Sequence, residues 1–128
     1  MKPDTPNTCS CESGRQYDIC CKPFHDGADA PTAEALMRSR YTAYVLKLEG
    51  YLLATWHAST RPAELDLSQD AIKWLGLSVK HTETTGDIAT VEFVARYRIG
   101  GGRAEKMHEI SRFVRENGSW FYVDGKIE

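Results

Sequence analysis

Apolar side chains recur at helical spacing over residues 32–48 and predict a first helix there. The positions that carry this spacing are Met37, Tyr41, Tyr44, Val45 and Leu48. Thr32 is the expected N-cap, because its hydroxyl can accept a hydrogen bond from a backbone N–H group of the first turn. A second helix is predicted over about residues 49–56, and a short third helix over residues 66–72.

Beyond Trp74 the apolar positions change to a period of two residues, which is typical of strands with one buried face. The first such strand alternates at Leu75, Leu77, Val79 and His81, and the second at Val91, Phe93, Ala95, Tyr97 and Ile99. Two further strands are predicted over residues 104–115 and 120–123, with turns at residues 86–87, 100–102 and 117–118. Helices followed by a four-stranded antiparallel meander indicate an α+β fold, whose curved sheet packs on the helices as an open cone.

All four cysteines lie in one short N-terminal segment, at positions Cys9, Cys11, Cys20 and Cys21. Clustered thiols in reducing surroundings favour a metal over a disulfide scaffold, which would distribute its cysteines along the chain. Four thiolates complete the tetrahedral shell of zinc, so the spacing predicts a structural zinc knuckle with no open coordination position. Ser13 and Gly14 can form the turn between the two cysteine pairs, and Tyr17 and Ile19 can cover the metal from water.

Other chemistry for the cysteines stays open at this point. Cys20 and Cys21 could form a redox-active vicinal disulfide, or the thiols could be free and inert. His25 is a possible substitute ligand, although four thiols already fill the shell. Thiolate sites also accept iron or cadmium.

The cysteine segment has the pattern CxCxSGxxYxxCC over residues 9–21. This pattern resembles the SEC-C zinc motif, named from the C-terminal tail of the bacterial preprotein translocase ATPase, in which the last ligand is often His where this chain has Cys21. The rest of the chain resembles the YchJ-type family of small uncharacterised bacterial proteins over residues 23–27, 30–41, 51–57, 60–62, 108–109 and 120–125. The resemblance implies a SEC-C-like zinc-binding motif over residues 1–27 and a nuclear transport factor 2-like domain over residues 28–128.

A cone of this kind offers an interior pocket, and a few residues with polar or titratable side chains could line it. Glu109 and Ser111 share a strand face with Met107 and Phe113, which places a carboxylate among apolar neighbours. Trp56, His57 and Arg61 follow the second helix. A pair of His57 with Glu109 could perform acid–base chemistry, although an inward glutamate more often pairs with an arginine for structural reasons. No catalytic residue is therefore assigned.

Charge and hydropathy narrow the choice of partners. Sixteen basic and eighteen acidic residues give a formal net charge of −2, which does not favour non-specific nucleic-acid binding. Arg96, Arg98, Lys106 and Arg112 could form a basic strip on the outer face of the sheet, so nucleic acid stays a minor possibility. No apolar run is long enough to cross a bilayer, and the N-terminus has no apolar leader, so we expect a cytoplasmic protein.

These features predict a zinc-stabilised adaptor that binds a partner protein through the knuckle, while the cone binds the partner or a small molecule. The translocase tail that carries the related motif recruits an export chaperone, so the resemblance implies a protein partner. The alternative is a small-molecule enzyme with acid–base residues in the pocket. A third possibility is a ligand-binding or dimerisation module without chemistry.

Overall fold

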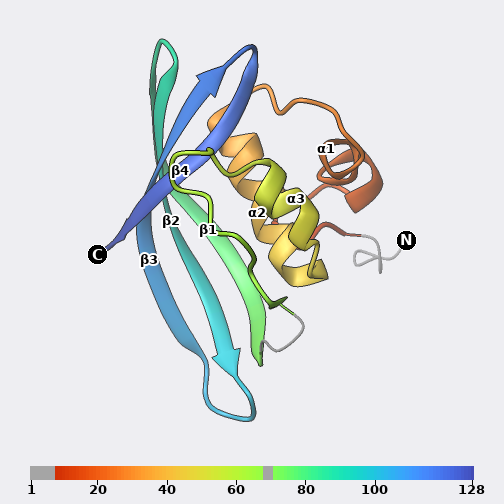
Figure 1. Ribbon diagram of the computed structural model, residues 1–128. Helices are drawn as coiled ribbons and strands as arrows, with labels where there is room; N and C mark the ends of the chain where they lie inside the picture. The colour runs from red at the N-terminus through yellow and green to blue at the C-terminus, as the bar shows by residue number, and fades with distance from the viewer. Residues whose placement is uncertain (1–7, 68–70) are drawn as a thin grey trace.

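Helices cover the concave face of a curved antiparallel sheet in the computed structural model, which describes residues 8–67 and 71–128 (Figure 1). The elements run in the order η1 (Tyr17–Ile19), α1 (Lys22–His25), α2 (Ala33–Leu46), α3 (Glu49–Ala54), β1 (Ile72–Thr85), β2 (Ile88–Ile99), β3 (Glu105–Glu116) and β4 (Ser119–Ile127). The strands form one sheet in the order β1-β2-β3-β4, so each strand pairs with its neighbour in sequence. The predicted α+β meander is confirmed.

Helix α2 begins where the sequence predicts and ends slightly earlier. The Thr32 side chain accepts a hydrogen bond from the Ala35 amide at 3.0 Å, which is the expected N-cap. The helix ends because Lys47 adopts a left-handed conformation with a φ of 59°. Its buried residues include Leu36, Met37 and Tyr41, of which Met37 and Tyr41 line the space between the helix and the sheet.

Helix α3 ends at Ala54, two residues before the expected end at Trp56. The chain leaves the helix because it pairs with β4: the Tyr122 amide donates to the Thr55 carbonyl at 2.9 Å, and the His57 amide donates to the Tyr122 carbonyl at 2.7 Å. A long-range backbone interaction therefore replaces the last helical turn.

The short helix expected over residues 66–72 is wrong at its C-terminal end, because Ile72 is already the first residue of β1 and lies opposite Ile99. Residues 68–70 of that expectation lie outside the described residues. The Gly100 amide donates to the Ala71 carbonyl at 3.1 Å, which continues the sheet pairing beyond Ile72. Strand pairing decides the conformation of this segment.

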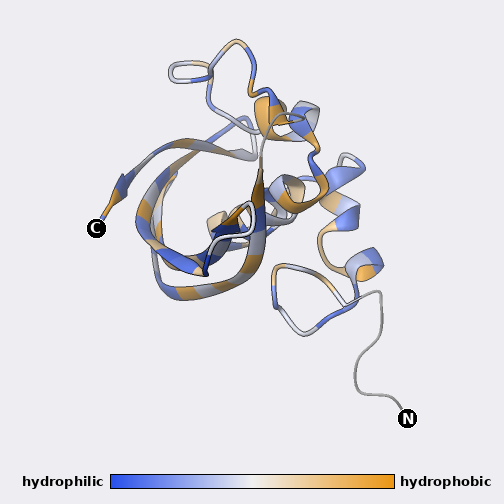
Figure 2. Cartoon of the chain, turned by 90° about the horizontal axis from the view of Figure 1, so that it is seen from below, coloured by the Kyte–Doolittle hydropathy of each residue, from blue (hydrophilic) through white to orange (hydrophobic). Residues whose placement is uncertain are grey.

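Hydrophobic and hydrophilic residues alternate along the strands as the period of two predicts (Figure 2). The alternation holds in β2, where Ala89, Val91, Phe93 and Ala95 are buried. It shifts in β1, because a bulge between Trp74 and Gly76 breaks the register. As a result Trp74, and not Leu75, faces inward together with Leu77.

The core is continuous from the cysteine segment to the sheet. One cluster of buried residues joins the four cysteines to α2 side chains such as Leu36 and to sheet residues such as Leu77 and Phe113. A smaller cluster of Ala43, Leu52 and Leu67 lies between α2 and α3. Among the described residues, no helix has the length and apolar character needed to span a membrane.

Candidate functional site

The four cysteine sulfurs converge on one point at the N-terminal end of the molecule. All four Sγ atoms lie within 4.8 Å of one another, and the Cys11–Cys20 and Cys20–Cys21 distances are 3.6 and 3.9 Å. Four sulfurs at 2.3 Å from a tetrahedral zinc are separated from one another by about 3.8 Å. The side chains are 0–4% exposed, so the cluster is closed to solvent. The donor set and its spacing fit a tetrahedral thiolate metal site.

A tight loop places the first pair of cysteines. The Cys9 amide donates to the Arg15 carbonyl at 2.9 Å, which closes a loop of residues 9–15. We call this segment the cysteine loop. Within the loop Glu12 and Gly14 have φ values of 63° and 89°, and glycine adopts this left-handed conformation without steric cost. The second pair follows directly, because η1 ends at Ile19 and α1 begins at Lys22. The turn expected at Ser13-Gly14 is therefore where the chain reverses.

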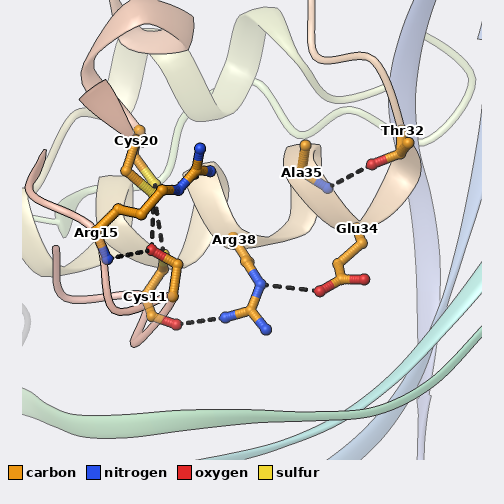
Figure 3. Close-up of polar contacts among 9 residues, drawn as sticks. Cys11, Arg15, Cys20, Thr32, Glu34, Ala35 and Arg38 are labelled. Atoms are coloured by element: carbon orange, nitrogen blue, oxygen red, sulfur yellow. Dashed lines mark hydrogen bonds and ion pairs between the residues drawn. The ribbon is translucent and has the colours of Figure 1, made fainter. Parts of the chain in front are cut away.

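Polar groups surround the sulfurs and tie the cysteine loop to α2. Ser13 Oγ lies 3.1 Å from Cys20 Sγ, and Thr42 Oγ1 of α2 lies 3.6 Å from Cys9 Sγ. Arg38 of α2 donates from Nη1 to the Cys11 carbonyl oxygen at 2.6 Å, and from Nε to Glu34 at 3.0 Å (Figure 3). Such outer groups fix the orientation of metal ligands in thiolate sites.

The close packing of the thiols shifts the pKa of Cys9, Cys11 and Cys21. Hydrogen bonds from Cys11 and Cys21 lower the pKa of the Cys9 thiol, whereas the interactions with Cys11 and Cys9 raise the pKa of Cys21. At Cys11 a hydrogen bond with Cys21 acts to lower the pKa, but the contact with Cys9 and burial outweigh it and raise the pKa to about 11. Thiols must lose their protons to bind a metal, so a bound cation would take the place of the thiol protons.

His25 is placed as a neighbour of the cluster and makes other interactions. Its Nδ1 lies 2.7 Å from the Tyr17 hydroxyl, and its Nε2 lies 2.8 Å from the Ser39 carbonyl oxygen. Both ring nitrogens of His25 therefore already have hydrogen-bond partners.

All four cysteines are free, and no disulfide bond joins Cys20 to Cys21.

Ile19 does not cover the cysteine cluster, contrary to expectation. Its side chain is 63% exposed, whereas Tyr17 packs against the core that contains the cysteines. The 3-10 turn η1 directs Ile19 away from the cysteine cluster, and α2 supplies the cover in its place through Thr42.

An interior cavity of about 260 Å³ lies between α2 and the concave face of the sheet. Six aromatic rings form much of its wall: Tyr41, Tyr44, Trp74, Phe93, Phe113 and Tyr122. Three polar side chains also line it, namely Arg40 from α2 and Glu109 and Ser111 from β3. The inward direction of Glu109 and Ser111 agrees with the strand alternation.

Glu109 is held on the inner face of β3 by two neighbours. Ser111 Oγ donates to Glu109 Oε2 at 2.6 Å. Gly125 on β4 leaves room for the carboxylate, because a Cβ there would overlap Glu109 Oε2. The carboxylate therefore lies flat against the sheet.

Arg40 is buried at the same cavity, with 5% of its surface exposed. Its Nη1 donates to the Leu52 carbonyl at 2.8 Å and to Thr55 Oγ1 at 2.7 Å. The guanidinium carbon lies 5.0 Å from the centre of the Trp56 ring and 4.6 Å from that of Tyr122. Burial lowers the pKa of Arg40, because desolvation disfavours its charge.

The pairing of His57 with Glu109 is wrong. His57 Nε2 lies 2.8 Å from Glu116 Oε2 at the surface, and its Nδ1 lies 2.8 Å from Ser59 Oγ. Arg61 donates to the Trp56 carbonyl at 3.1 Å, outside the cavity. Trp56 contacts the cavity indirectly, because its ring packs on the buried Arg40 guanidinium. Of the five residues expected at the pocket, the structure brings only Glu109 and Ser111 to it.

Arg40 is a cavity residue that the apolar spacing of residues 32–48 does not predict. The helical spacing nevertheless indicates its burial, because Arg40 lies four residues after Leu36 and three after Met37, which are both buried. An arginine at such a position must be paired or stacked within the fold.

The predicted basic strip is interrupted by carboxylates. Arg96 does lie opposite Lys106 across the β2–β3 pair. Arg112, however, forms two hydrogen bonds of 2.6 Å with Asp124, and His108 lies 2.7 Å from Glu92. Arg96 also lies 3.5 Å from Glu12 of the cysteine loop. Alternating charges of this kind are typical of a solvated sheet face.

Comparison with known proteins identifies both parts of the chain. A family model described as "YchJ, middle NTF2-like domain" matches residues 32–125. A UPF0225 protein of Xanthomonas campestris pv. campestris is 54% identical over 98% of this chain and 100% of the relative, and one of Bordetella parapertussis is 52% identical over 98% and 96%.

Two solved structures share the fold across the cysteine segment and the sheet. A SEC-C motif containing protein from Rhodopseudomonas palustris has a TM-score of 0.83 and 38% identity, covering 92% of this chain and 96% of the other. One from Psychrobacter arcticus has a TM-score of 0.75 and 29% identity, covering 95% and 82%. The chain therefore belongs to the YchJ-type family, in which a SEC-C cysteine motif accompanies an NTF2-like domain.

Proposed function

We propose that this protein is a zinc-stabilised adaptor that binds a partner protein through its cysteine knuckle, residues 8–27. The observation that carries the proposal is the closed cluster of Cys9, Cys11, Cys20 and Cys21. Four buried thiols supply a full tetrahedral shell, which leaves no coordination position for a substrate. A metal held in this way stabilises a surface and performs no reaction.

Zinc is the proposed metal because closed all-cysteine tetrahedral sites are typical of structural zinc. Its binding needs reduced thiols, which agrees with a cytoplasmic location. The division of the chain at residues 27 and 28 stays a prediction, since the two parts share one core.

The contact with the partner is proposed to centre on Ile19. This side chain lies between the two ligand pairs and exposes 63% of its surface, so the metal fixes the turn that presents it. Exposed charged residues of both signs, Arg15, Asp18 and Lys22, lie close to it in the sequence, so bulk charge would not select the partner. The likeness to the translocase tail, which recruits an export chaperone, supports a protein as the partner. The interrupted charge pattern of the sheet does not favour nucleic acid.

The enzyme alternative loses the pair on which it rested, because His57 lies with Glu116 and not with Glu109. We therefore do not propose an acid–base reaction in the cavity.

Metal content is the first test. Protein purified without chelator should contain about one zinc per chain by elemental mass spectrometry, and its four thiols should react with a thiol reagent only after chelation or unfolding. One iron per chain would mean that the structural metal of the proposal is iron and not zinc. Metal-free protein with two thiols recovered only after reduction would overturn it in favour of a Cys20–Cys21 disulfide.

The interaction is tested with a photocrosslinking residue at position 19 in bacterial cells. Ile88 on β2 is the matched control, because it is 62% exposed and also aliphatic. We expect one protein adduct at position 19 that is absent at position 88, and that disappears from position 19 when Cys9→Ser and Cys20→Ser remove the metal site. The same adducts at both positions, or adducts that survive loss of the metal site, would contradict the adaptor function.

A further inference from the structure

We propose that the interior cavity binds a small zwitterion, an amino acid with an apolar side chain, whose carboxylate meets Arg40 and whose ammonium group meets Glu109. This inference does not depend on the metal centre or on the proposed adaptor function, because it rests on the residues of α2, β3 and β4.

The first observation is the unused half of the Arg40 guanidinium. A guanidinium has five N–H donors, and both donors of Nη1 are taken by Leu52 and Thr55. Within the described part of the chain, the side-chain hydrogen bonds of Arg40 all come from Nη1, and neither Nε nor Nη2 is among the fully enclosed atoms that lack a partner. Nε and Nη2 therefore keep some accessible surface, and Arg40 lines the cavity. Together they form the edge of the guanidinium that binds a carboxylate with two parallel hydrogen bonds.

The second observation is that Arg40 is held in place without a counter-ion. Among the described residues no ion pair includes Arg40, although the residue is only 5% exposed. Its bonds to the end of α3 and the rings of Trp56 and Tyr122 orient the charge and compensate it in part. A buried charge of this kind is expected to have a partner, and an anion in the cavity would supply it.

The third observation concerns Glu109, which lines the same cavity with the opposite charge. Ser111 bonds to its Oε2, which leaves Oε1 without a hydrogen bond among the described residues. Glu109 and Arg40 line the same cavity but form no ion pair among the described residues. Two opposite charges that face one space without meeting fit a ligand that carries both complementary charges, and a simple anion would be repelled by Glu109.

The walls and the volume set the size of the ligand. A cavity of about 260 Å³ corresponds to roughly nine water molecules at the volume each has in the liquid. The aromatic walls, among them Trp74 and Phe93, favour an apolar or aromatic body between or beside the charged groups. An amino acid such as phenylalanine or leucine combines this size with both charges.

The test measures the affinity of the full-length metal-bound protein for three probes by calorimetry and by intrinsic tryptophan fluorescence, to which Trp74 in the cavity wall contributes. L-phenylalanine carries both charges, 3-phenylpropionate lacks the ammonium group, and phenethylamine lacks the carboxylate. We expect L-phenylalanine to bind at least about tenfold more tightly than either of the other probes, because each loses one charge-assisted hydrogen-bonded contact.

A second set of affinity measurements uses a substitution at Glu109, because Arg40→Ala could prevent the protein from folding. Glu109→Gln keeps the shape of the side chain and should weaken L-phenylalanine about tenfold while it strengthens 3-phenylpropionate. Glu92→Gln on the outer face of the sheet is the matched control and should leave both affinities unchanged. Absence of binding by all three probes would overturn the proposal. So would equal binding of L-phenylalanine and 3-phenylpropionate with no effect of Glu109→Gln.

Discussion

Arg38 of α2 donates a hydrogen bond to the main-chain carbonyl of Cys11 at 2.6 Å, so the helix holds the backbone of a residue in the four-cysteine cluster (Figure 3). The same guanidinium is oriented by Glu34 one helical turn earlier. Together with Thr42, which lies 3.6 Å from Cys9 Sγ, this contact makes α2 the support on which the cysteine loop rests.

Loss of the hydrogen bond between Arg38 and the Cys11 carbonyl should make the folded protein less stable. We expect Arg38→Ala to lower the free energy of unfolding by about 1–2 kcal/mol, because a hydrogen bond from a charged donor is lost and the Cys11 carbonyl loses its partner. Denaturant unfolding of the metal-bound protein measures the change. Glu34→Gln is the control, since it removes only a partly exposed ion pair and should cost at most about 0.5 kcal/mol. Equal losses in both variants would show that the carbonyl bond contributes little.

Removal of the metal should destabilise the whole domain and not only the knuckle. The cysteines share one core with Leu36, Leu77 and Phe113, so loosening them exposes apolar surface of α2 and the sheet. We expect a strong chelator to lower the Tm by at least roughly 10 °C, which corresponds to a loss of about 3 kcal/mol in a domain of this size. Calorimetric scans before and after chelation measure the shift, and added zinc should restore the original Tm. An unchanged Tm after all four thiols have become reactive would show that the two parts are independent.

The features that the sequence predicted correctly depend on neighbours in the chain. The cysteine spacing brings the four sulfurs together because a single short loop separates the pairs. Strand alternation places Glu109 and Ser111 at the cavity because β3 is regular from Met107 to Phe113 on that face.

The features that the sequence did not reveal depend on residues that are distant in the chain. His57 bonds Glu116, which is 59 positions away, and Trp56 leaves its helix to pair with Tyr122. The bulge that turns Trp74 inward is set by pairing with β2. The spacing of apolar residues cannot predict such contacts, because they form only when the sheet packs against the helices.

Gly125 should be required for the position of Glu109. Its φ is not in the left-handed region, so an alanine there meets no backbone strain, but its Cβ would overlap the Glu109 carboxylate. We expect Gly125→Ala to lower the free energy of unfolding by about 1–3 kcal/mol through overpacking. The double variant Glu109→Ala with Gly125→Ala should recover part of this loss. Gly101→Ala is the matched control, because a Cβ at Gly101 meets no atom within 4 Å. If the double variant lost as much unfolding free energy as the two single variants together, overlap with Glu109 would not be the cause of the loss in Gly125→Ala.

Alkaline pH should destabilise the protein through its buried tyrosines. Burial raises the pKa of Tyr41 to about 12 from an ordinary value of 10.0, and burial also raises the pKa of Tyr51 and of Tyr122. The unfolded chain therefore releases these protons at a lower pH than the folded protein does. Their contribution to stability is complete below pH 10 and is lost as the pH rises toward 12.

Tyr41→Phe isolates one of these groups. We expect the free energy of unfolding of this variant to fall less steeply between pH 10 and pH 12 than that of the natural protein, because one proton fewer is released on unfolding. Denaturant unfolding at several pH values in this range measures both slopes, and the contributions of lysines and of the metal site cancel in the comparison. Absorbance at 295 nm should in parallel show one phenol fewer ionising near pH 12 in the folded variant. Identical slopes would mean that Tyr41 ionises equally readily in the folded and unfolded chains.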